Sequence, residues 1–136
     1  LNSAERKIFN FIAHGTVDTL NNANWYRLES IQFMSGKEYV KPGSELQIKN
    51  LAMIMDAYPN VEFRLKGYVD AGMNEQEGTT LSNRRAKYIM SLIVGEGIAF
   101  TRMKATGGDH TKPVADEQTE EGRARNRRVE ICVSKK

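Results

Sequence analysis

An aspartate and an arginine fifteen positions apart are the first candidates for chemistry in this sequence. Asp70 ends a run in which apolar and polar residues alternate, and Arg85 lies near the start of a segment with helical spacing. A carboxylate accepts hydrogen bonds from an ammonium group, and a guanidinium holds a carboxylate through two parallel hydrogen bonds. The pair, delivered by two different elements, suggests a site for a small zwitterion such as the head group of an amino acid.

The predicted helix places Arg85 on its apolar face. Leu81 and Ile89 share that face, because each is four residues from Arg85. A buried charge left unpaired costs several kcal/mol, about 3–5 when its partner is removed. Three interpretations stay open: Arg85 clamps a ligand, it forms a structural ion pair with Asp70, or its alkyl stem covers apolar surface.

The residues that follow Asp70 mark the end of a predicted strand. Ala71 and Gly72 come directly after it. Strand ends that meet helix starts are favoured ligand positions in sheets built with crossover helices. We therefore expect backbone groups of Ala71 and Gly72 to add contacts beside Asp70.

The end of the chain is rich in arginine. Residues 123–136 contain six basic residues against one acid, Glu130. Such a segment favours phosphate or carboxylate partners, or it is a solvated basic edge strand. If it is extended, Arg127 shares a face with Val129 and Ile131. Arg127 then either supports the site from the end of the sheet or closes the fold through hydrogen bonds to loops.

Hydrophobic patterns predict the elements that must position these groups. They indicate, in order, a helix over 4–14, a strand over 25–33, a helix over 44–58, a strand over 61–69, a helix over 80–94, a strand over 103–107, a loop over 107–122 with room for a helical turn, and a strand over 128–134. The repeated strand–helix–strand order favours parallel neighbours, and the last strand could pair antiparallel.

The composition excludes several function classes. The 136 residues suit one domain with its own core, and the net charge is only +3. No apolar run approaches the ~20 residues that span a bilayer. The one cysteine, Cys132, permits no internal disulfide, and His14 and His110 lie far apart without a metal-ligand pattern. We therefore expect no metal, no cofactor and no enzymatic activity.

Four motifs, taken in order, resemble the OmpA-like (OmpA/MotB) peptidoglycan-associating domain over about three quarters of the chain, from 33 to 133. They are Gly67-Tyr68-Val69-Asp70, the segment 81–86 (Leu-Ser-Asn-Arg-Arg-Ala), Gly107 with Pro113, and the segment 122–130. The closing Asn-Arg-Arg-Val-Glu-Ile is the most specific piece.

The resemblance implies an α+β fold, that is, an α/β sandwich. It implies a mixed four-stranded sheet with helices packed on one face, in the order βαβαββ, plus a short N-terminal helix. We expect residues 1–24 to form the N-terminal helix and a loop, and residues 25–136 to form the OmpA-like domain.

The resemblance also implies noncovalent peptidoglycan binding through the diaminopimelate of the stem peptide. In the family an aspartate and a helix arginine hold the ammonium and carboxylate of that group, roles that fall here to Asp70 and Arg85. The domain is expected to anchor a larger envelope protein at the periplasmic side of the outer membrane of a Gram-negative bacterium. The chain begins without Met, which suggests a processed form or a piece of a longer protein. We expect a missing upstream part to carry a barrel, lipid or other membrane attachment. The sequence indicates no oligomeric state.

Four positions depart from the family pattern. Val69 stands in place of threonine, Gly78 of asparagine, Gly108 of an aromatic residue and Asp109 of glycine. They motivate an alternative, a degenerate module that serves structure or protein interaction without binding peptidoglycan. A rival from another class is RNA binding by the sheet. Such sheets present stacking aromatic residues, and the basic run contains none, so we expect no nucleic-acid partner.

Overall fold

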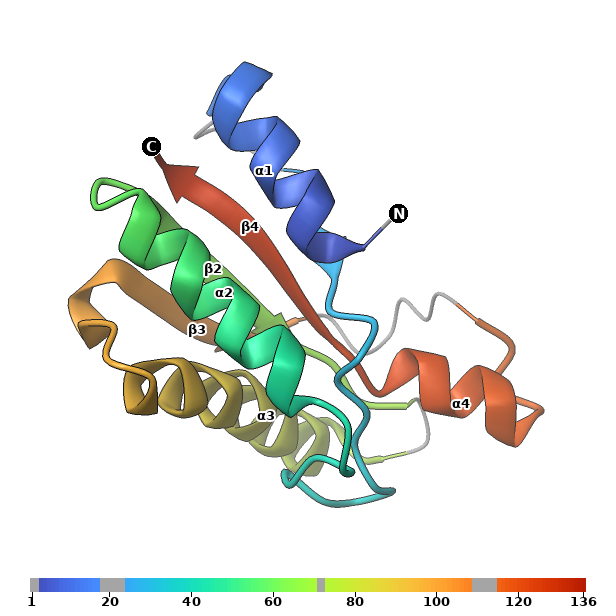
Figure 1. Ribbon diagram of the computed structural model, residues 1–136. Helices are drawn as coiled ribbons and strands as arrows, with labels where there is room; N and C mark the ends of the chain where they lie inside the picture. The colour runs from blue at the N-terminus through green and yellow to red at the C-terminus, as the bar shows by residue number, and fades with distance from the viewer. Residues whose placement is uncertain (1–2, 18–23, 71–72, 109–114) are drawn as a thin grey trace.

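The computed structural model describes residues 3–17, 24–70, 73–108 and 115–136 (Figure 1). Its elements are α1 (Ala4–His14), β1 (Tyr26–Arg27), α2 (Glu45–Ala57), β2 (Glu62–Gly67), α3 (Glu75–Gly95), a 3₁₀ turn (Phe100–Arg102), β3 (Met103–Gly107), α4 (Glu120–Asn126) and β4 (Val129–Lys135). The bounds of α1 and β3 are those predicted, and the ends of α2, β2 and β4 differ from the prediction by one or two residues.

The strands form one mixed sheet in the order β1-β4-β2-β3. β2 and β3 are parallel neighbours connected through α3, and β4 runs antiparallel to both β2 and β1. Along β2, Phe63 and Leu65 are buried while Arg64 between them is exposed, as alternation requires. The predicted mixed four-stranded sheet is confirmed.

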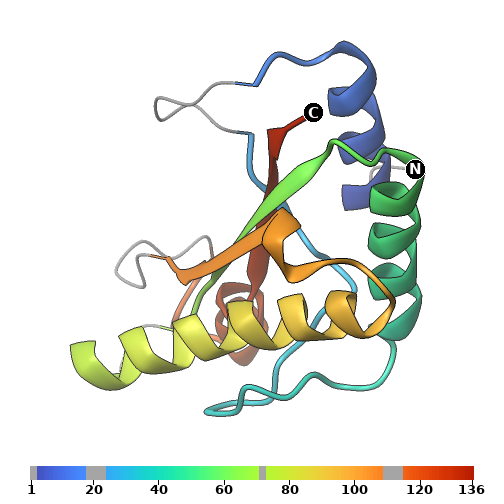
Figure 2. The same ribbon diagram turned by 90° about the vertical axis from the view of Figure 1, so that its left-hand side faces the viewer.

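Helices α1, α2 and α3 cover one face of this sheet, and α4 lies beyond its end, where β4 begins (Figures 1 and 2). The core fills the space between the three helices and the sheet. It includes Ile8 of α1, Leu51 of α2, Ile89 of α3 and Ile131 of β4. The predicted packing of helices on one face is confirmed. Among the described residues, no helix is both long and apolar enough to cross a membrane.

Helix α3 crosses the ends of β2 and β3 at very short range. A Cβ atom at Gly67 would lie 2.1 Å from the carbonyl oxygen of Ser82, and one at Gly107 would lie 2.3 Å from the Ser82 hydroxyl. Gly67 and Gly107 are paired in the sheet. This contact, which only glycines allow, fixes where the next turn of α3 carries Arg85.

The predicted strand over 25–33 is confirmed only in part, because just Tyr26–Arg27 pairs in the sheet, as β1. The amide of Leu28 still donates to Val129, but the amide of Ile31 donates back to Leu28 in a turn. The turn buries Leu28 and Ile31 under the helices. Burial of these two apolar side chains therefore overrides the strand-like pattern.

Two helices differ from the sequence prediction. α3 begins five residues early because the Asn74 side chain caps it, accepting from the amide of Glu77 at 2.8 Å. α4 begins at the end of the predicted loop over 107–122, which has room for a helical turn, and continues beyond it to Asn126. Thr119 caps it by accepting from the amide of Gly122 at 2.9 Å, and the acidic Glu120 in its first turn suits the helix dipole.

Candidate functional site

Arg85 is wholly buried at the end of the sheet, with 0% of its surface exposed. Its Nε donates to the carbonyl of Lys37 at 2.9 Å, Nη1 to the carbonyl of Tyr68 at 2.9 Å, and Nη2 to the carbonyl of Met34 at 3.2 Å. The guanidinium also lies over the ring of Phe33, 4.8 Å from its centroid. Three segments that are distant in sequence therefore converge on one cation.

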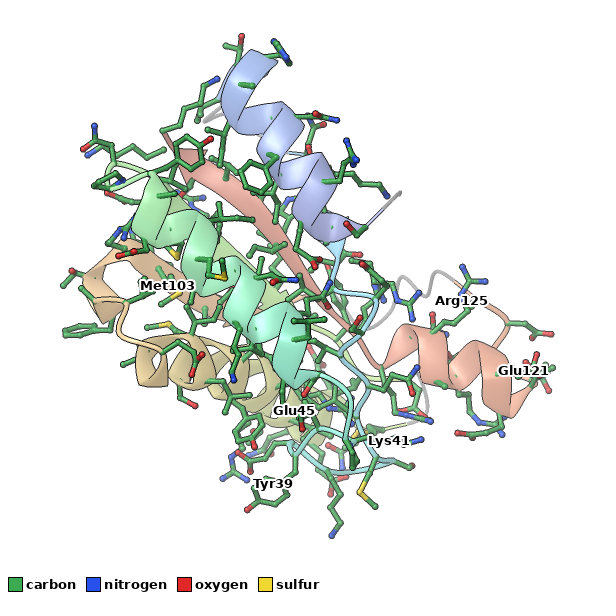
Figure 3. All side chains as sticks on the ribbon, viewed as in Figure 1. Tyr39, Lys41, Glu45, Met103, Glu121 and Arg125 are labelled. Carbon is green, nitrogen blue, oxygen red and sulfur yellow. The ribbon has the colours of Figure 1, made fainter. Side chains whose placement is uncertain are left out.

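The loop that carries two of these carbonyls is shaped by a glycine. Gly36 has a φ of 70°, which glycine adopts without strain. The resulting turn lets the amide of Lys37 donate to Met34 and brings both carbonyls to Arg85. Farther along the loop, Tyr39 and Lys41 lie below α2 (Figure 3). Sequence reasoning missed this contribution, for which Gly36 was the only local signal.

In the part of the chain that the structure describes, no carboxylate pairs directly with Arg85. Burial lowers the pKa of Arg85 to about 10, nearby Asp70 opposes that shift and Arg127 adds to it. Arg85 therefore stays protonated at neutral pH. Among the described residues its hydrogen bonds all go to neutral carbonyl oxygens, so the direct ion pair with Asp70 considered above is not formed.

Asp70 contacts a different arginine. Its Oδ2 lies 3.5 Å from Nη1 of Arg127, and the side chains of Asp70 and Arg127 are 17% and 2% exposed. The other terminal nitrogen of Arg127 pairs with Glu120, while its Nε is buried without a partner in the described part of the chain. The hydrogen bond between Arg127 and the Glu120 carboxylate lowers the pKa of Glu120.

Arg127 reaches this position from the end of α4 rather than from a strand. The strand begins only at Val129, and Arg127 is the C-cap of α4, so the alternating faces predicted for this segment do not apply. Asn126, which is wholly buried, fixes the helix end by exchanging two 3.0 Å hydrogen bonds with the backbone of Ala115. The segment thus both closes the fold and supports Asp70, two roles that the sequence left as alternatives.

The remaining predicted positions have mixed outcomes. Ala71 and Gly72 lie outside the described residues, as does Asp109. Val69 is buried, and Gly78 is buried on α3. A Cβ at Gly108 would lie 2.3 Å from the ring of Tyr68, so that ring takes the space where a side chain is usual. No group of three His, Cys, Asp or Glu residues that could hold a metal occurs in the described ranges.

Comparison with known proteins gives the family. The OmpA family model matches residues 32–127, which is more than half of the chain. This chain belongs to the OmpA family. Outer membrane porin F of Pseudomonas fluorescens is 40% identical over 103 residues, which cover 76% of this chain and 32% of that protein. The chain therefore spans about a third of this relative's length.

Two further OmpA-family similarities bear on function and fold. The peptidoglycan-binding protein ArfA of Mycobacterium tuberculosis is 34% identical over 87 residues, 64% of this chain and 27% of that protein. The crystal structure of the peptidoglycan-associated lipoprotein from Burkholderia pseudomallei aligns with a TM-score of 0.72 at 20% identity, covering 76% of this chain and 87% of that one. The names of these matched proteins describe envelope or peptidoglycan-binding proteins and no enzyme.

Proposed function

We propose that this domain binds peptidoglycan noncovalently through the diaminopimelate of the stem peptide. Arg85 holds the carboxylate of the diaminopimelate head group, and Asp70 accepts from its ammonium. The observation that carries the proposal is that Arg85 keeps its charge in the interior without a carboxylate hydrogen bond from the described residues. Three of its five N–H groups are used, which leaves one on each terminal nitrogen for the two oxygens of a carboxylate.

The Asp70 carboxylate can also accept further hydrogen bonds. Its contact with Arg127, at 3.5 Å, is longer than the ~2.7–2.9 Å of a strong charge-assisted hydrogen bond. Arg127, shared with Glu120, therefore positions Asp70 without saturating it. A lysine side chain would satisfy Asp70 with its ammonium but would bring no carboxylate to Arg85. The site should accordingly prefer diaminopimelate to lysine.

The rest of a stem peptide has space beside the site. A polar hollow of about 470 Å³ lies between the loop at Gly36 and the first turns of α3, where Met73, Thr80 and Arg84 line it. Arg84 is on the solvent side of the helix that buries Arg85. We propose Ala71 and Gly72, which directly follow Asp70 in the chain, as further backbone contacts to the ligand.

The cellular role rests on the relatives. Porin F is an outer membrane protein of which the matched region is about a third. We propose that residues 25–136 form the anchoring domain, that 1–24 are an N-terminal addition, and that the whole protein is tied by this domain to the cell wall on the periplasmic side of the outer membrane. Attachment to the membrane itself would come from an upstream region.

A second candidate is a module that uses the same fold for structure or protein interaction. The complete burial of Arg85 and its three carbonyl contacts favour it, because such contacts are also what a purely structural arginine makes. In this case the buried guanidinium joins loop, strand end and helix, and no ligand is required.

Substitution of Asp70 separates the two candidates. Asp70→Asn keeps the shape and removes the charge, so binding to isolated peptidoglycan sacculi should weaken about 30-fold, or roughly 2 kcal/mol. Stability should change by less than about 1 kcal/mol, because the carboxylate is partly exposed. Sedimentation with sacculi and urea denaturation measure the two effects, and Asp56→Asn on the exposed side of α2 is the matched control. Equal binding by the Asp70→Asn and Asp56→Asn variants would contradict the proposal and support the structural candidate.

A further inference from the structure

The face of the sheet opposite α1–α3 carries an array of cations. Arg27 of β1 and Lys66 of β2 pair with Glu130 of β4 from its two sides. Two residues before Lys66 on β2, Arg64 pairs with Lys104 of β3. With Arg128 at the end near the site, we call Arg27, Arg64, Lys66, Lys104 and Arg128 the basic face. Arg64 and Lys104 are exposed, Arg27 and Lys66 are half-buried, and Arg128 is buried. In the described part of the chain no helix packs on this face of the sheet (Figure 2).

The positive charge of the basic face is poorly compensated. Two carboxylates lie in these rows of the sheet, and both are already engaged: Glu130 accepts from Nε of Arg128 at 2.8 Å, and Glu62 lies 3.5 Å from Nζ of Lys135. Of the ion pairs between described residues, none includes Arg27, Arg64 or Lys104. Like charges gathered on one surface repel, and an anionic partner relieves that repulsion.

Within the described ranges, Arg27 is an unpaired cation that lies beside other cations on this face. Its Nε is buried and has no hydrogen-bond partner in the residues that the structure describes. Burial lowers the pKa of Arg27, Arg125 lowers it further and Glu29 opposes the shift. Arg125 extends from the exposed surface of α4 (Figure 3), so a further cation stands at the margin of the basic face.

The aromatic rings on this side are already engaged by cations. Nζ of Lys66 lies 4.4 Å from the centroid of the Trp25 ring, and the guanidinium of Arg128 lies 3.8 Å from that of Tyr68. Nucleic-acid bases bind open sheets by stacking on free aromatic faces. The basic face instead offers charges, which suit the carboxylates of a polymer.

The basic face is continuous with the diaminopimelate site. Arg128 directly follows Arg127, which contacts Asp70. The carbonyl of Tyr68 accepts from Arg85 while its ring lies under Arg128. An anionic polymer held at Asp70 and Arg85 would therefore have its neighbouring segments beside the basic face.

We infer that the basic face is a second contact surface for peptidoglycan, which binds free carboxylates of stem peptides next to the one held in the site. This inference rests on the proposed function. Once one stem peptide is bound, its neighbours on the same polymer are present at high effective concentration, so weak contacts add to the overall affinity. Such contacts are screened by salt.

Charge reversal on the basic face tests the inference. Arg64→Glu/Lys104→Glu should weaken binding to diaminopimelate-containing sacculi about five- to tenfold at low salt, with the difference shrinking at high salt. The neutral pair Arg64→Gln/Lys104→Gln should lose less. Affinity for a soluble stem peptide should stay within about twofold, because one peptide gains nothing from a second contact. The control, Arg6→Glu/Lys7→Glu, makes the same charge change on exposed α1.

The outcomes separate this inference from the proposed function. Loss of sacculus binding in the Arg64/Lys104 variants but not in the Arg6/Lys7 variant supports the basic face. Equal effects of both reversals, or none, overturn it even if the soluble peptide still binds. Failure of the unsubstituted protein to bind the soluble peptide overturns the proposed function. Tighter binding to phosphatidylglycerol vesicles than to sacculi, abolished by Arg64→Glu/Lys104→Glu, would assign the face to a membrane and also overturn the inference.

Discussion

Arg85 and Arg127 are both buried arginines, but their surroundings differ. Arg85 donates only to carbonyl oxygens among its described partners, whereas Arg127 contacts two carboxylates. A buried guanidinium that donates only to neutral oxygens is stabilised further when an anion binds next to it. Because of this difference we assign ligand binding to Arg85 and positioning to Arg127, although both are buried.

The sequence predicted the important residues better than their partners. Arg85 was recognised because a guanidinium on an apolar helix face needs an acceptor, and the structure buries it completely. Its acceptors could not be predicted, because Met34, Lys37 and Tyr68 contribute backbone carbonyls that leave no mark on side-chain patterns. The contact of Arg127 with Asp70 depends on the end of α4, a helix that the pattern did not reveal.

The pairing of Arg127 with Glu120 predicts an acid-sensitive contact. The hydrogen bond to Arg127 lowers the pKa of Glu120 in the folded protein. A depressed carboxyl pKa adds stability that is fully present above the unfolded-state pKa and is lost as the pH falls through the folded-state pKa. NMR titration of the Glu120 side chain should therefore give a pKa below its ordinary value, and Arg127→Gln should raise it.

A matched variant makes the pH prediction specific. Arg123 also contributes to the shift of Glu120, but by a smaller amount than Arg127. Arg123→Gln should accordingly change the pKa of Glu120 less than Arg127→Gln does. A larger effect of Arg123→Gln on the pKa of Glu120 would show that Arg123, and not Arg127, is the main partner of Glu120.

At the scale of elements, the sequence pattern predicted the bounds of those helices and strands that depend mainly on local signals. α1 and β3 have their predicted bounds. The segment after β1 leaves the sheet and buries Ile31. A single sequence does not show where burial of a side chain stabilises a turn more than strand pairing would. α4 could have been found, because Thr119 followed by two acidic residues is a typical helix start.

The contact between α3 and β2 gives a prediction at this scale. Gly67→Ala puts a methyl group against the backbone of Ser82, so α3 must shift and carry Arg85 with it. We expect a loss of about 2–3 kcal/mol in the free energy of unfolding, together with weaker stem-peptide binding. Urea denaturation and an NMR fingerprint spectrum measure the change.

Gly95→Ala is the control for this substitution. Gly95 ends the same helix, and a Cβ there would have no atom within 4 Å. The change should be neutral or stabilise the domain by up to about 1 kcal/mol. Equal destabilisation by Gly67→Ala and Gly95→Ala would mean that the close crossing does not position Arg85.

At the scale of the whole molecule, the order of elements predicted the architecture. Helical crossovers favour parallel neighbours, and β2, α3 and β3 follow that rule. The central position of antiparallel β4 was implied by the family resemblance and not by periodicity, since pairing order is a long-range property. The basic face likewise emerges only when β1, β4, β2 and β3 are placed side by side, because its residues come from distant segments.

The most direct test of the central claim is an NMR titration of the labelled domain. A stem peptide that contains diaminopimelate is added to one sample, and the otherwise identical lysine peptide to another. We expect saturable shifts centred on Asp70 and Arg85 with the diaminopimelate peptide, and much weaker shifts with the lysine peptide. A folded domain that shows no shifts with diaminopimelate, or equal shifts with both peptides, would contradict the claim that these two residues recognise the diaminopimelate head group.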